Sequence, residues 1–171
     1  MKAIKKTCFV TVIPLFFNCE YNNSTNQLVL NIDAVIQKTD SINVYYTKTK
    51  DINFTDKQSF WIKVAANKKN QNIQIIFPDS ILPKQIRLDF GKNIVQKDIV
   101  LNKISFTYKN KNFSAKGKEI FYIFREDQNN TIVDKSIGSI KRKNPKQENG
   151  PSLYPKGDKL FNRLNQLYSD K

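Results

Sequence analysis

Five residues of this 171-residue chain have types and spacing suited to binding a polar ligand. They are Tyr45, Trp61, Lys63, Arg87 and Asp89. Each alternates with apolar residues of an expected β-strand, so all five should lie on the outward face of a sheet. Aromatic rings stack on the apolar faces of sugars, while charged side chains hydrogen-bond to hydroxyl groups. The set therefore predicts a shallow carbohydrate site.

The same residues also fit a purely structural role. Tyr, Trp and Lys are favoured cross-strand partners on any half-exposed sheet, and Arg87 with Asp89 can form a structural ion pair. Asn43 and Gln74 follow the same alternation and are expected on that face too. In this interpretation the exposed aromatic residues indicate a scaffold protein with a protein partner.

Catalytic chemistry has little support in the composition. The chain contains no His, which is the usual base near neutral pH and a common metal ligand. Its aspartates show no pair spacing, and most of them fall in expected turns. Up to residue 98 they are Asp33, Asp40, Asp51, Asp56, Asp79, Asp89 and Asp98. We therefore expect no enzyme activity, no metal and no cofactor.

The formal net charge of +14 favours anionic partners but does not identify one. Nucleic-acid binding would depend on the basic stretches 141–146 and 67–70, with Tyr108 and Tyr122 between them. The lysines are spread over many Asn-rich loops and are not gathered in one stripe. We expect no nucleic-acid partner.

Residues 1–18 have the pattern of an export signal. A lysine-containing start precedes the apolar segment 7–17, which is too short to span a bilayer. The stretch LFFNC, ending at Cys19, resembles a bacterial lipobox, although Asn18 stands where a small residue is usual. We expect cleavage before Cys19, acylation of that cysteine and anchoring in the bacterial cell envelope, either periplasmic or surface-exposed.

Cleavage would also change the charge and the cysteine content. It would remove Lys2, Lys5, Lys6 and Cys8, lowering the net charge from +14 to +11 and leaving a lone cysteine. The alternative is a buried N-terminal strand, in which Cys8 and Cys19 are core residues or a disulfide pair. The signal-peptide interpretation accounts for the lysines, the apolar segment and the cysteine together.

From residue 28 to residue 90 the apolar residues alternate with period two, which indicates strands with one buried face. The expected buried positions are Leu28, Leu30, Ile32, Ala34, Ile36, Ile42, Val44, Tyr46, Phe60, Ile62, Val64, Ile73, Ile75, Phe77, Ile86, Leu88 and Phe90. Residues 66–71 are expected to be a turn, and Gly91 is expected at positive φ. Short, evenly spaced strands predict a mainly β fold, an antiparallel β-sandwich.

A sixth strand is expected over residues 99–108. Its apolar positions change from odd to even near Asn102 and Lys103, which predicts a β-bulge. Residues 117–125 fit a helix or an edge strand equally well. One helical stripe follows near the C-terminus, with Asp158 placed to cap it. It contains Leu160, Phe161, Leu164, Leu167 and Tyr168.

These patterns divide the chain into five parts. We expect a signal peptide at 1–18, a lipidated cysteine and tether at 19–26, the sandwich at 27–140, a basic loop at 141–157 and a helix packed on the sandwich at 158–169.

Three stretches carry a likeness to a known type of domain: INVYYTKTKDINFTDKQSFWIKV, IIFPDSILPKQIRLDFG and DIVLNKISFTYKNKNFSAKGKEI. They resemble an uncharacterised extracytoplasmic β-sandwich of bacterial envelope proteins that often accompanies polytopic membrane proteins of the glycosyltransferase type. The resemblance implies a jelly-roll-like fold similar to carbohydrate-binding modules, without catalytic residues. We therefore expect a non-enzymatic envelope lipoprotein acting as a binding or scaffold module, with a carbohydrate-binding module as the alternative.

Overall fold

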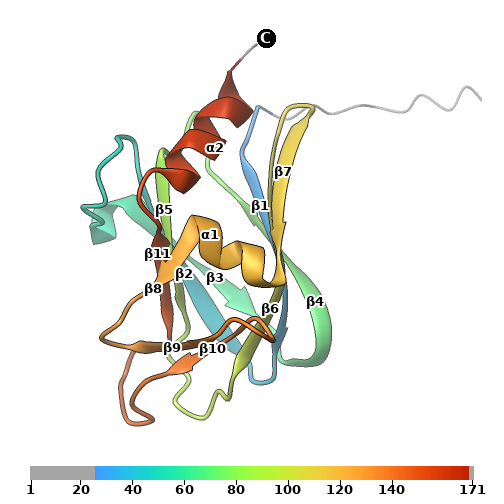
Figure 1. The fold of residues 1–171 in the computed structure, drawn as a ribbon, viewed down its shortest axis with the longest axis vertical. Coiled ribbons are helices and arrows are strands. Elements are labelled where there is room, and N and C mark those ends of the chain that lie inside the picture. Colours follow the sequence, from blue (N-terminus) through green and yellow to red (C-terminus); the bar gives the residue numbers. More distant parts are fainter. Residues whose placement is uncertain (1–25, 170–171) are drawn as a thin grey trace, which may run out of the picture.

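The computed structural model describes residues 26–169, which form two antiparallel β-sheets packed as a sandwich (Figure 1). The six-stranded sheet has the order β4-β1-β6-β10-β9, with β7 also paired to β6. Its strands are β1 (Val29–Ile36), β4 (Asn67–Ile76), β6 (Ile99–Tyr108), β7 (Lys111–Lys116), β9 (Thr131–Asp134) and β10 (Ser139–Arg142). The five-stranded sheet has the order β3-β2-β5-β11-β8. Its strands are β2 (Asp40–Thr47), β3 (Ser59–Val64), β5 (Gln85–Phe90), β8 (Phe124–Glu126) and β11 (Ser152–Pro155).

Alternating apolar residues of both sheets form one core between them. Leu30, Ile75, Leu88 and Phe106 are fully buried there, and burying such a side chain stabilises the fold by about 1.5–3 kcal/mol. The expected core positions are confirmed, with Phe60 and Ile62 of the edge strand β3 half-buried. The predicted mainly β sandwich is therefore correct.

The predicted β-bulge is confirmed in the pairing of β1 with β6. Asp33 pairs with Lys103, but Ala34 pairs with Leu101, so Asn102 has no partner on β1. The extra residue moves the side-chain alternation by one position, and apolar residues on both sides of the bulge therefore face the same core.

One expected turn was wrong. Residues 66–71 belong mostly to β4, which begins at Asn67 and pairs with β1 as far as Ile36. In this sheet β4 pairs with β1 alone, at the edge, so its first residues bury little and carry no apolar alternation. Gly91, in the loop between β5 and β6, has a φ of 79°, which confirms the predicted positive value.

The C-terminal part contains more structure than the sequence predicted. Residues 117–125 form the 3₁₀ turn η2 (Gly117–Glu119), the helix α1 (Ile120–Ile123) and the start of β8, so both expected states occur in succession. The expected loop at 141–157 contains β11, which lies between β5 and β8. This strand is short and bounded by Pro151 and Pro155, so it leaves no clear alternation.

The C-terminal helix α2 (Lys159–Tyr168) packs on the sandwich as predicted (Figure 1). Its leucines Leu160, Leu164 and Leu167 are buried. Asp158 holds the N-cap position but makes no capping hydrogen bond. Its carboxylate instead forms an ion pair with Lys50 at 2.8 Å.

The predicted signal peptide and Cys19 lie outside the described residues. Within residues 26–169 no helix is long and apolar enough to cross a membrane.

Candidate functional site

Four of the five predicted site residues meet in one hollow of about 480 Å³ on the outward face of the five-stranded sheet. Strand β2 lies between β3 and β5, so Tyr45 faces Ser59 on one side and Arg87 on the other. Two residues earlier, Asn43 faces Trp61 and Asp89. The lining residues are Asn43, Tyr45, Asp56, Ser59, Trp61, Arg87, Asp89, Gly91, Lys92 and Asn149.

Two predicted members of this face lie elsewhere. Lys63 pairs with Ser41 two residues beyond Trp61, where it is exposed and does not line the hollow. Gln74 is on β4, opposite Asn31, in the other sheet. Alternation indicates which face of its own strand a residue takes, but it does not indicate which of the two sheets the strand joins.

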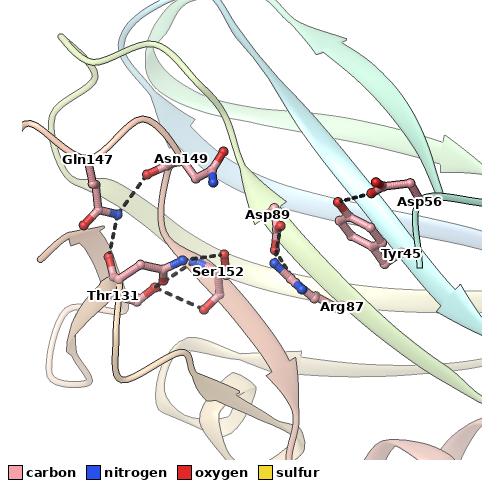
Figure 2. Close-up of polar contacts among 9 residues, drawn as sticks. Tyr45, Asp56, Arg87, Asp89, Thr131, Gln147, Asn149 and Ser152 are labelled. Atoms are coloured by element: carbon pink, nitrogen blue, oxygen red, sulfur yellow. Dashed lines mark hydrogen bonds and ion pairs between the residues drawn. The ribbon is translucent and has the colours of Figure 1, made fainter. Parts of the chain in front are cut away.

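Arg87 and Asp89 form a bidentate ion pair along one strand (Figure 2). The Nε and Nη2 atoms of Arg87 donate to the two carboxylate oxygens of Asp89 at 2.7 and 2.6 Å. Burial works against the charged guanidinium, but the hydrogen bond and the charge of Asp89 outweigh it, so the pKa of Arg87 is raised. This arginine is thus fixed in one orientation.

Aromatic rings hold the guanidinium group from two sides. Its central carbon lies 4.8 Å from the ring centroid of Tyr45 and 4.5 Å from that of Tyr154. Arg125 in turn lies over Tyr154 at 5.0 Å. Cation–π contacts of this kind add to the rigidity of the sheet face beside the hollow.

Tyr45 is also oriented by the short segment η1 (Asp56–Gln58). Its hydroxyl donates to a carboxylate oxygen of Asp56 at 3.0 Å (Figure 2). Burial, followed by this hydrogen bond and the charge of Asp56, raises the pKa of Tyr45. The phenol therefore stays neutral at the hollow throughout the physiological range.

Trp61 forms an open aromatic rim. It is 47% exposed, because β3 is the edge strand of its sheet. The Nζ atom of Lys92 lies 5.0 Å from the ring centroid, so a flexible, charged side chain borders the ring, and about half of the tryptophan is open to solvent.

Asn43 has the least usual environment of the set. It is only 2% exposed, because its neighbours on β3 and β5 are the larger Trp61 and the paired Asp89. Its Oδ1 atom is buried and accepts no hydrogen bond from the described residues. A buried amide oxygen without a partner costs about 1–3 kcal/mol. Asn43 therefore lines the hollow with an amide whose oxygen is shielded from solvent and has no partner among the described residues.

A polar network fixes the loop that brings Asn149 to the hollow (Figure 2). The Nε2 atom of Gln147 donates to the backbone oxygens of Asn130 and Asn149, both at 2.8 Å. The Thr131 hydroxyl accepts from the backbone N–H of Ser152 at 2.7 Å, which ties β9 to β11. The side chain of Gln147 thus holds the backbone of Asn149 and ties it to Asn130, next to β9.

The residues that sequence reasoning missed come mainly from loops. Asp56, Lys92 and Asn149 all line the hollow, but none follows an alternating pattern. Ser59 does alternate with the half-buried Phe60 and was the one omitted residue with a usable signal.

The charged residues that line the hollow balance, with Arg87 and Lys92 opposed by Asp56 and Asp89. The described residues include no cluster of three or more acidic or sulfur-containing side chains that could hold a metal ion. The arrangement combines a half-exposed flat ring with fixed polar groups, which suits a neutral ligand with several hydroxyl groups.

No family model, curated protein or solved structure matches the chain. The geometry of the hollow is therefore the main indication of function.

Proposed function

We propose that this protein is a non-enzymatic binding module of the bacterial cell envelope, and that its ligand is a carbohydrate held in the hollow on the five-stranded sheet. The unpartnered Oδ1 atom of Asn43 carries the proposal. This oxygen is shielded from solvent, so a ligand would contact it only after the Asn43 side chain turns toward the hollow. A sugar hydroxyl could then donate the hydrogen bond that the oxygen lacks.

Trp61 supplies the second requirement of a sugar site. Its exposed ring can stack against the apolar face of a pyranose while the hydroxyls at the sugar's edge reach Asn43. Both residues lie directly opposite one another on β2 and β3, so one ligand can contact both. Lys92 would move aside or contact the edge of the bound ring.

The ion pair acts as a fixed wall of this site. Arg87 already forms two hydrogen bonds with Asp89 and lies over the rings of two tyrosines. Neither charged side chain therefore has to be reordered when a ligand enters, and binding loses little conformational entropy there. The balanced charge of the lining favours a neutral sugar over a simple anion, despite the net charge of +14.

The N-terminal pattern supports the proposed location. Acylation of Cys19 would hold the sandwich at a membrane, since each buried methylene contributes about 0.8 kcal/mol. The resemblance to extracytoplasmic sandwich domains near glycosyltransferase-type membrane proteins supports the same location and ligand class. A scaffold role for the exposed sheet face would explain Trp61 but not the buried acceptor of Asn43.

The test is a glycan array followed by calorimetry with the strongest hit. Trp61→Ala should weaken that binding at least tenfold, because losing a central stacking ring costs about 2 kcal/mol or more. Tyr122→Ala removes a ring that is 62% exposed but does not line the hollow, so this control should bind normally.

Salt distinguishes stacking from adhesion by net charge. Binding in the hollow should survive about 0.4 M salt, where the Debye length is roughly 5 Å. An array without a hit at low salt, or equal losses in both variants, would reject the carbohydrate proposal.

A further inference from the structure

A second hollow, of about 300 Å³, lies between α1 and α2 and is lined by an aromatic residue and three cations. The lining residues are Tyr122, Ile123, Lys156, Lys159 and Arg163. No carboxylate is among them. This hollow shares no lining residue with the one on the five-stranded sheet.

Local structure gathers the three cations. Lys156 follows β11 directly, and its backbone N–H donates to the carbonyl of Ile123 at 2.9 Å. Its Nζ atom also donates to the carbonyl of Phe121 at 3.3 Å. Lys159 and Arg163 are four residues apart on α2, so they lie on the same side of the helix. The fold therefore keeps like charges together.

The three cations have no carboxylate in direct contact among the described residues. Within residues 26–169, none of Lys156, Lys159 and Arg163 forms an ion pair. Glu119 lines an adjoining hollow that shares Tyr122, Ile123 and Arg163 with this one. Its carboxylate accepts from the backbone N–H of Lys116 at 3.1 Å and forms no ion pair with Arg163. Like charges at this spacing on a helix are destabilising, and a bound anion would relieve their repulsion.

We propose that this hollow binds a phosphate group. A phosphate has enough oxygens to accept hydrogen bonds from an arginine fork and two lysines at once. Tyr122 is 62% exposed beside the three cations, and its ring is placed to contact the organic part of a phosphorylated ligand. The proposal does not depend on carbohydrate binding at the other hollow.

The experiment titrates the purified full-length protein with inorganic pyrophosphate in calorimetry at 50 mM salt. Arg163→Gln should weaken binding at least tenfold. Lys69→Gln makes the same change of charge at an exposed position of β4 and should stay within twofold of the wild type. Lys159→Gln provides a second variant in case Arg163→Gln lowers the melting temperature.

A parallel arm asks whether the phosphate belongs to a lipid. Vesicles of phosphatidylcholine with and without phosphatidylglycerol are sedimented with each variant. A loss specific to Arg163→Gln on the anionic vesicles alone assigns the site to a lipid headgroup, and a loss in the pyrophosphate titration assigns it to a soluble phosphate. Absence of binding in both arms, or equal losses in Arg163→Gln and Lys69→Gln, would overturn the proposal.

Discussion

Asn43 and Trp61 lie directly opposite each other in the pairing of β2 with β3, yet 2% of Asn43 is exposed against 47% of Trp61. The hollow therefore has a polar floor beside an aromatic rim. A hydrogen-bond donor of a ligand would suit Asn43 in the floor, and an apolar surface of the same ligand would suit the ring of Trp61 at the rim.

Replacing the floor residue should separate binding from stability. Asn43→Leu keeps a similar volume but removes the unpartnered oxygen, so the free energy of unfolding should stay constant or rise by up to about 1 kcal/mol. Carbohydrate binding should be lost in the same variant. Urea denaturation and calorimetry measure the two effects, and a clear loss of stability would show that Asn43 serves the fold.

Breaking the ion pair of Arg87 with Asp89, beside Asn43, should instead lower the free energy of unfolding. In Arg87→Met the carboxylate of Asp89, whose side chain is 13% exposed, loses its partner. Breaking a buried pair costs about 3–5 kcal/mol, and partial exposure should reduce the loss here to about 2 kcal/mol. The measurement is the urea midpoint.

The matched control for that pair is the double variant Arg87→Met with Asp89→Leu. It removes both charges and should recover most of the lost stability. If the double variant is as unstable as the single one, the stacking of Arg87 between two tyrosines, and not the ion pair, stabilises this face.

Strand alternation was enough to predict the sandwich and the bulge at Asn102, and a glycine in the following turn was enough to predict the positive φ of Gly91. At Gly91 an added Cβ would overlap the carboxylate of Asp40, so the turn requires glycine for space as well as for φ. These features were predictable because each follows from local geometry.

The rest of the site was not predictable in this way. Asp56, Lys92 and Asn149 reach the hollow through loops, whose paths depend on long-range contacts such as those of Gln147. The burial of Asn43 depends on which strands flank β2, and alternation within one strand contains no information about its neighbours.

The packing of α2 gives a further prediction. Leu164 is fully buried, so Leu164→Asp would place an unpaired charge in the core and should lower the free energy of unfolding by at least about 3 kcal/mol. Asn162→Asp adds the same charge at an exposed position of the helix and should change it by less than about 0.5 kcal/mol. Similar stabilities for the two variants would mean that α2 does not contribute its apolar face to the core in solution.

The membrane anchor can be tested in cells fed a labelled fatty acid. Wild-type protein should take up the label, and Cys19→Ala should remain an unlabelled precursor. Cys8→Ala changes the cysteine within the apolar segment and should be labelled normally. Label retained in Cys19→Ala would exclude acylation at that residue.

The most direct test of the carbohydrate site is a nuclear magnetic resonance titration of ¹⁵N-labelled protein with the glycan that binds best on the array. The side-chain amide of Asn43 and the indole N–H of Trp61 should shift together and saturate at one dissociation constant, with backbone shifts along β2, β3 and β5. Saturable shifts confined to other surfaces, with the Asn43 and Trp61 signals unchanged, would contradict the assignment of the hollow as the binding site.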